Sequence, residues 1–186
     1  MSKTTLTHQL TETVEELSCL QSLKGLFHQH RDGNPLPSGK ALEEIIDLSR
    51  SILFPGYFGN SSVNISTIKY HIGVRLEKLY ARLSEQILAG LCFTNECEEE
   101  TTQELSMARA RASIMAAQAI NTFPKLRKIL ATDVEAAFEG DPAAKSIGEI
   151  IACYPVIKAL ANYRVAHELS ILGVPLIPRL MTELAH

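Results

Sequence analysis

Apolar residues recur every three or four positions along most of the chain, and this spacing predicts α-helices. The first such stretch covers residues 8–30, where one apolar stripe is formed by Leu10, Val14, Leu17, Leu20, Leu23 and Phe27. The segment Arg31–Gly39 then interrupts the pattern with two prolines and two glycines, which predicts a loop. We therefore expect an N-terminal amphipathic helix and its loop over residues 1–36.

Residues 37–186 continue with helical periods that short polar or proline-containing segments separate. Helices are expected over residues 39–54, 66–91, about 104–120, 134–138, 156–172 and 175–184, with one more that begins at Asp141-Pro142. No segment has the alternating pattern of a strand. The fold class is therefore predicted to be all-α, a bundle of about seven to eight helices.

Three of the expected helix starts carry capping signals. Ser66 is suited to be an N-cap, and Thr132 with Glu135 fits a capping box. Asp141 followed by Pro142 fits an N-cap with proline at the first helical position. Local sequence alone thus makes Asp141 a structural cap. A carboxylate has several acceptor sites, however, so capping leaves some of them for a ligand.

Composition narrows the classes of protein to consider. The net charge of −3 and the pI near 6.1 give no basic footprint for nucleic acid. No apolar run approaches the roughly 18 residues that a membrane-spanning helix needs, and the N-terminus is too polar for a signal peptide. We expect a cytoplasmic protein. The four cysteines form no CxxC pair, and Glu183-x-x-His186 is a single copy of a spacing that di-iron bundles use twice, so no metal site is predicted.

Two features near the C-terminus concern packing, and the first of them leaves two alternatives open. The segment Ile171–Leu184 is rich in apolar residues, and it either covers a partner or packs back on its own bundle. In the helix before it, Arg164 and Glu168 are spaced to form an ion pair along one face. His167 is interpreted as a structural residue, because a lone helical histidine is more often packed or capping than catalytic.

Four short segments resemble the N-terminal helical domain of the serine O-acetyltransferases. They are Thr132-Asp133-Val134, Asp141-Pro142-Ala143, Tyr154-Pro155 and Tyr163-Arg164-Val165-Ala166-His167. The run SGKALEEIIDLSRSILFPGYFG is similar to the longer-headed branch of that family. The resemblance covers most of the chain, most firmly residues 130–186, and assigns residues 37–186 to the helical domain. Where the family usually has a glycine and a histidine after Tyr-Pro, this chain has Val156 and Lys158, and Gly140 stands where an arginine often precedes the Asp-Pro-Ala motif.

The resemblance implies transfer of an acetyl group from acetyl-CoA to L-serine, the first step of cysteine biosynthesis. The family joins its helical domain to a left-handed β-helix of hexapeptide repeats, which holds the acetyl-CoA site and a histidine general base. These 186 residues contain no such repeats. By its position in the family motif, Asp141 would bind the substrate and hold the ammonium group of serine. This chain would supply no catalytic residue and bind no cofactor, and acetyl-CoA would be a co-substrate of the full-length enzyme only.

The resemblance also implies a homo-oligomer assembled through helical domains, a hexamer in the full-length family. Cysteine synthase is a possible partner of the parent protein only, and neither nucleic acid nor membrane is expected to bind. By itself the chain is predicted to be an inactive oligomerisation and serine-site domain. The alternative is a stand-alone helical protein-interaction module without catalysis.

Overall fold

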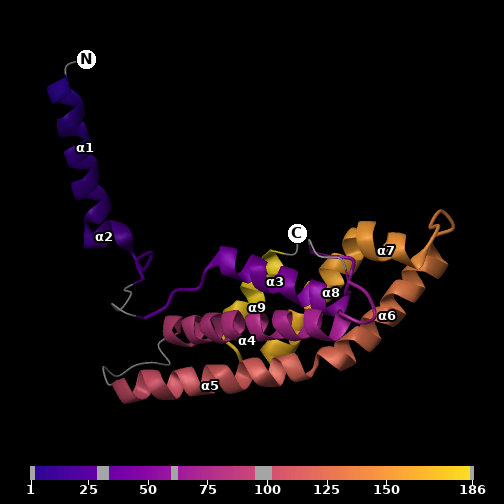
Figure 1. Ribbon diagram of the computed structural model, residues 1–186. Helices are drawn as coiled ribbons and strands as arrows, with labels where there is room; N and C mark the ends of the chain where they lie inside the picture. Colours follow the sequence, from indigo (N-terminus) through magenta and orange to yellow (C-terminus); the bar gives the residue numbers. More distant parts are fainter. Residues whose placement is uncertain (1–2, 29–33, 60–62, 95–101, 185–186) are drawn as a thin grey trace. The chain divides into compact units, whose positions relative to one another are not determined.

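The computed structural model describes residues 3–28, 34–59, 63–94 and 102–184, and the chain divides into two units, residues 1–33 and 34–186. Figure 1 follows the helices in chain order. Every regular element in the described residues is a helix, which confirms the all-α class. These residues hold nine helices, of which eight have seven residues or more, in agreement with the expected seven to eight; the additional one is the four-residue α2, because the first expected helix is divided in two. None of the described helices combines the length and apolar character needed to cross a bilayer.

The first unit contains α1 (Lys3–Ser18) and α2 (Leu20–Leu23). The prediction of one helix over residues 8–30 is wrong, because the backbone at Cys19 is extended, with φ −66° and ψ 127°. The helical run then ends at Lys24 and Gly25, which both have positive φ, a conformation that closes helices.

Within its own unit, the apolar stripe of α1 is not buried. Leu10, Val14 and Leu17 expose between 60% and 68% of their surface. Periodicity thus predicted the helix and its apolar face, but burial of that face requires a contact that this unit does not supply.

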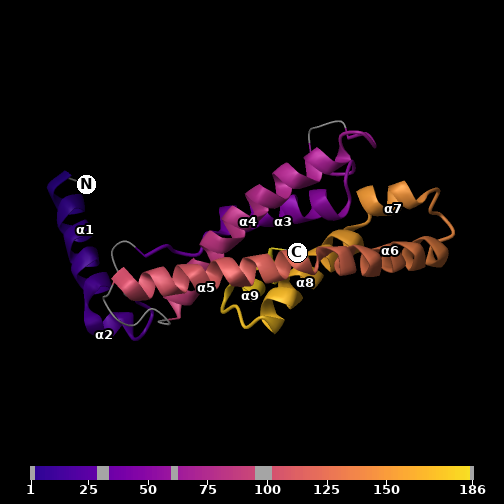
Figure 2. The same cartoon turned by 60° about the horizontal axis from the view of Figure 1, so that its bottom comes forward.

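The second unit is a bundle in which the chain passes back and forth along long helices. Its elements are α3 (Gly39–Leu53), α4 (Ile68–Phe93), α5 (Thr102–Asn121), α6 (Phe123–Gly140), α7 (Ile147–Cys153), α8 (Pro155–Ile171) and α9 (Ile177–Glu183). α4 packs against α3 and against α5. α6 follows α5 nearly in line in Figure 2, whereas Figure 1 shows a clear bend between them, and α7 and α8 pack along α6.

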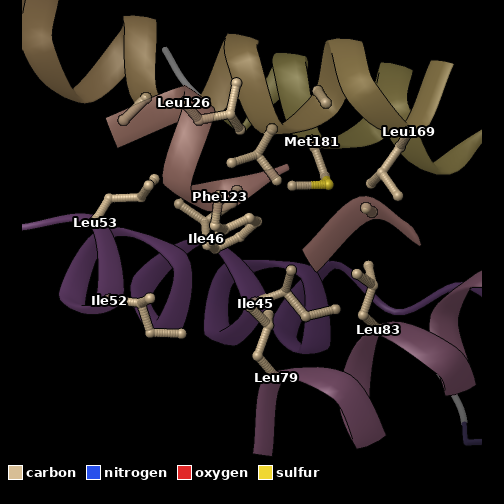
Figure 3. Close-up of a cluster of buried hydrophobic side chains, with 14 of the residues drawn as sticks. Ile45, Ile46, Ile52, Leu53, Leu79, Leu83, Phe123, Leu126, Leu169 and Met181 are labelled. Carbon is tan, nitrogen blue, oxygen red and sulfur yellow. The ribbon is translucent and has the colours of Figure 1, made fainter. Parts of the chain in front are cut away.

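The core lies where α3 meets the other helices. α3 is amphipathic, and its face of apolar side chains is closed to solvent, with Leu42 and Ile45 fully buried. Figure 3 shows Ile45 close to Leu79 of α4, while Ile46 lies beside Phe123 at the start of α6. This central packing fixes α6 and α8, the two helices that carry the segments of family resemblance.

The C-terminal segment packs back on its own bundle. Ile177 and Met181 of α9 are fully buried, which decides between the two alternatives left open by the sequence. The turn before α9 presses against α4 at Gly90, where an added Cβ would lie 2.8 Å from the Pro175 carbonyl oxygen. Only glycine permits that approach, and Leu176 in the same turn adopts a positive φ of 59°.

Two of the predicted caps are wrong. α4 begins at Ile68, and the turn before it is closed by the Asn64 side chain, which accepts a hydrogen bond from the Thr67 N–H at 3.0 Å. Ser66 instead donates its hydroxyl to Asn64. Thr132 opens no helix either, because α6 is continuous through it. The Thr132 hydroxyl donates to the Ile129 carbonyl at 2.7 Å, as a mid-helix threonine does.

An arrangement close to a capping box is present 14 residues after Thr132, at the start of α7, where Ser146 is the N-cap and Glu149 reaches back to the residue before it. The Ser146 hydroxyl accepts from the Glu149 N–H at 3.1 Å, and the Glu149 carboxylate accepts from the Lys145 N–H at 2.9 Å. Reciprocal bonds of this kind satisfy helix-start donors that would otherwise have no partner. α7 therefore begins at Ile147 and leaves the preceding residues free to form a turn.

Candidate substrate-binding site

Asp141 lies at the end of α6 and begins the turn that leads towards α7. Its carbonyl accepts from the Ala144 N–H at 3.0 Å, and its carboxylate oxygen Oδ1 accepts from the Ala143 N–H at 2.9 Å. Aspartate at the first position and proline at the second are typical of such a turn. The prediction that Asp141 is the N-cap of a helix is wrong, because the chain makes a turn here and the next helix is capped by Ser146.

The second carboxylate oxygen of Asp141 accepts a short hydrogen bond from the hydroxyl of Tyr154. Tyr154 joins α7 to α8, and its backbone is extended because Pro155 follows it. The Tyr154 N–H also donates to the Ile150 carbonyl at 3.2 Å. The backbone of Tyr154 is therefore anchored to α7, and its hydroxyl reaches the Asp141 turn from there.

This contact shifts the titration of both groups. The Tyr154 hydroxyl, followed by the Ala143 N–H, holds the pKa of Asp141 below its ordinary value. The same hydrogen bond, together with burial, raises the pKa of Tyr154 to about 12. At neutral pH the pair is thus a carboxylate and a neutral hydroxyl, and it carries one negative charge.

A second aspartate of the resembling segments has a different partner. Asp133, inside α6, receives two hydrogen bonds from the guanidinium of Arg164 on α8, at 2.8 and 2.7 Å. The expected ion pair between Arg164 and Glu168 is wrong, because this bidentate contact takes the guanidinium. Asp133 and Arg164 are largely buried, with 19% and 25% of their side chains exposed. The pair is neutral and joins the two helices.

His167 lies away from Asp141, on the wall of a cavity of about 400 Å3 between α8 and α9. Its ring stacks on Tyr163 with centroids 5.8 Å apart, and Arg179 of α9 also lines the cavity. Neither Asp141 nor Tyr154 lines this cavity. Among the described residues, no group of three or more His, Cys, Asp or Glu side chains could hold a metal ion.

Comparison with known proteins adds to this geometry. No family model matches the chain. Over 155 residues it is 41% identical to a plasmid serine acetyltransferase of Synechococcus elongatus, a match that covers 82% of this chain and 48% of that protein. Over these 155 residues the chain is homologous to the matched half of that serine acetyltransferase. A serine acetyltransferase of Synechocystis sp. is 46% identical over 56 residues, which cover 30% of this chain and 22% of the relative.

Solved structures agree with this relationship. Serine acetyltransferase 1 of Entamoeba histolytica, crystallised in complex with L-cysteine, matches 96% of this chain and 56% of its own with a TM-score of 0.59 and 26% identity. Isoform 3 from the same organism, in complex with cysteine, matches 77% of this chain and 45% of its own with a TM-score of 0.60 and 26% identity. The chain therefore spans about half the length of the serine acetyltransferases that it matches.

The structure also brings together the segments that carry the resemblance. Asp133 contacts Arg164, and Asp141 contacts Tyr154. Sequence reasoning identified Asp141 but missed both contacts, which join residues 31 and 13 positions apart. Periodicity identifies only residues that are neighbours along one helix, so it could not indicate these two contacts. The presence of all four family segments in one chain was the signal that could have suggested that they lie together.

Proposed function

We propose that this chain is the helical domain of a serine O-acetyltransferase and that Asp141 forms one wall of its serine site. The main support for this role is that the Asp141 carboxylate is held in place by hydrogen bonds but has no cationic partner among the described residues. This carboxylate is half-buried, fixed by hydrogen bonds to two of its neighbours, and in no ion pair with any residue that the structure describes. An aspartate in this state offers a fixed negative charge to a ligand.

The chemistry of L-serine suits such a group. At neutral pH serine carries an ammonium group, and hydrogen bonds between ammonium and carboxylate are about twice as strong as those between neutral groups. The lowered pKa of Asp141 keeps its carboxylate ionised under these conditions. Each carboxylate oxygen uses one acceptor site for a partner in the protein and keeps another for the substrate.

The role of Asp141 would be to bind and orient the substrate. In the reaction that the resemblance implies, the serine hydroxyl oxygen attacks the thioester carbon of acetyl-CoA while a histidine takes the hydroxyl proton. The C–S bond then breaks, and CoA leaves as the thiol after it regains a proton. The resemblance places that histidine and the acetyl-CoA site in hexapeptide repeats, which these 186 residues do not contain. We therefore propose that this chain alone transfers no acetyl group.

Assembly and location follow from the same proposal. The helical domain would associate with other copies of itself, and the exposed stripe of Leu10, Val14 and Leu17 on α1 is an apolar surface available for such contacts. Cysteine synthase would bind only the whole parent protein. A role in cysteine biosynthesis favours the cytoplasm.

The proposal is tested in a hybrid enzyme in which this chain replaces the matching segment of the Synechococcus elongatus plasmid serine acetyltransferase. We expect acetyl transfer from acetyl-CoA to serine. Asp141→Asn should raise KM for serine roughly 10- to 100-fold, because a charged hydrogen bond to the ammonium group is lost. KM for acetyl-CoA should stay within about twofold of the unsubstituted hybrid, since the proposed role of Asp141 is to bind serine alone.

Glu139→Gln is the matched control. Glu139 is an exposed carboxylate of the same helix, two residues before Asp141, and its removal changes the net charge by the same amount. It should leave both Michaelis constants unchanged. A folded hybrid without acetyl transfer, or an Asp141→Asn variant that raises both constants equally, would contradict the proposed role.

The second candidate function is a helical interaction module without catalysis. The uncovered apolar stripe of α1 favours it, because an exposed surface of this kind is typical of a contact site. This alternative predicts that the hybrid enzyme is folded but inactive, so the same assay separates the two functions.

A further inference from the structure

We propose that Tyr154 is a positioning residue of the serine site, whose hydroxyl holds the Asp141 carboxylate in the orientation that receives the substrate's ammonium group. The inference rests on the proposed function, because it concerns the same carboxylate. It adds a second residue to the site and gives the tyrosine a role that acts through Asp141.

Tyr154 is held in a fixed position by its backbone contacts. Tyr154 is half-buried against the core and sits between two helices, with its N–H bonded to the Ile150 carbonyl and its carbonyl accepting from the Ile157 N–H, both at 3.2 Å. Pro155 removes backbone freedom immediately after it. The hydroxyl therefore reaches Asp141 from a fixed point of the bundle rather than from a mobile loop.

Each oxygen of the Asp141 carboxylate has its own hydrogen-bond donor. The Ala143 N–H bonds to Oδ1 and the Tyr154 hydroxyl bonds to Oδ2, so each oxygen is held by a donor from a different direction. A turn with the Ala143 bond alone would leave the carboxylate able to rotate about its bond to Cβ. The tyrosine bond fixes this rotation, and substrate-binding groups gain from such support.

Tyr154 orients the Asp141 carboxylate without cancelling its negative charge. A cation at this position would neutralise Asp141, as Arg164 neutralises Asp133. The tyrosine hydroxyl donates a hydrogen bond but brings no positive charge, so the carboxylate is oriented and still attracts a cation. The other groups that act on Tyr154 are Glu149 and Cys153, and neither of these is cationic. The turn therefore keeps its negative charge for an ammonium ligand.

A double-mutant cycle in the hybrid enzyme tests the inference. Tyr154→Phe removes only the hydroxyl and should raise KM for serine about 3- to 10-fold, with KM for acetyl-CoA unchanged. In the Asp141→Asn background the same substitution should have no further effect, because the tyrosine acts through the carboxylate. Tyr70→Phe, at an exposed tyrosine of α4, is the matched control and should change neither constant.

The outcomes separate the two proposals. If Asp141→Asn raises KM for serine but Tyr154→Phe does not, the inference about Tyr154 fails and the proposed function stands. If Tyr154→Phe has its full effect in the Asp141→Asn background, the tyrosine acts independently and the positioning role is overturned. If Asp141→Asn itself has no effect on KM for serine, the proposed function fails.

A spectroscopic measurement on the 186-residue chain tests the contact without any enzyme assay. The sequence has five tyrosines and no tryptophan, so the ultraviolet absorbance of tyrosinate reports tyrosine ionisation alone. At pH 11, with helix content checked by circular dichroism, an ordinary tyrosine is roughly nine-tenths ionised and Tyr154 roughly one-tenth. Tyr154→Phe should leave the tyrosinate signal at this pH nearly unchanged, whereas Asp141→Asn should increase it by almost one tyrosine. Equal signals in the native chain and Asp141→Asn would contradict the contact.

Discussion

The interior of α6 and the turn that follows it each hold one aspartate, and the two aspartates have different surroundings. In the interior, Asp133 faces Arg164, which makes two hydrogen bonds and cancels its charge. In the turn, Asp141 faces Tyr154, whose hydroxyl donates a hydrogen bond but brings no positive charge, so the charge of Asp141 stays in place. Both aspartates belong to segments of family resemblance, but only the second can attract a cation. The partner of a carboxylate, more than its place in a motif, therefore separates a structural residue from a binding one.

The largest effect on stability is expected when Arg164 is replaced. Arg164→Met keeps most of the aliphatic packing but leaves Asp133 largely buried without its partner. The free energy of unfolding should fall by about 2 kcal/mol. Urea unfolding followed by circular dichroism measures it.

Glu168→Gln is the control for this substitution. Glu168 is the residue that spacing alone would pair with Arg164, and its change should alter stability by no more than about 0.5 kcal/mol. Asp141→Asn should also destabilise the chain much less than Arg164→Met. A loss with Glu168→Gln as large as with Arg164→Met would mean that the interior ion pair is wrongly assigned.

A smaller effect concerns Thr132 and Ser146, the two residues on either side of Asp141 whose sequences fit a helix cap. Ser146→Ala should lower the free energy of unfolding by about 1 kcal/mol, because the hydroxyl caps α7. Thr132→Ala should cost nothing or stabilise the chain slightly, since alanine is the better helix former inside α6. Thermal unfolding of the two variants side by side measures the difference. The reverse order would break the distinction between a continuous α6 and a capped turn.

The smallest effect is the dependence of stability on high pH. The pKa of Tyr154 is about 12 in the folded chain and near 10 when unfolded, so the unfolded chain releases this proton first. The stabilisation that Tyr154 provides is therefore complete below about pH 10 and is lost as pH rises towards 12. The difference in urea midpoint between the native chain and Tyr154→Phe should shrink from pH 9 to pH 11. A difference that stays constant would show that the hydroxyl proton is not held in the folded state.

Sequence periodicity predicted the helices well where one face of a helix meets the core, as α3 shows. It could not predict where α6 begins, because α6 starts at Phe123 and runs through the cap expected at Thr132. Both Thr132-x-x-Glu135 and Ser146-x-x-Glu149 fit a capping box, and which one forms depends on the packing of α6 against α8. Asp141 itself was identified from the resemblance. Its contact with Tyr154 could not be predicted, because it depends on the path of α7 between them.

Whether Asp141 binds the ammonium group of serine is tested most directly with a substrate analogue that lacks this group. In the hybrid enzyme, 3-hydroxypropanoate offers the same hydroxyl and carboxylate as serine but no cation for Asp141. We predict that Asp141→Asn raises KM for serine at least about tenfold while the inhibition constant of 3-hydroxypropanoate stays within about twofold. If both constants rise together, or neither changes, Asp141 does not bind the ammonium group and the central claim is wrong.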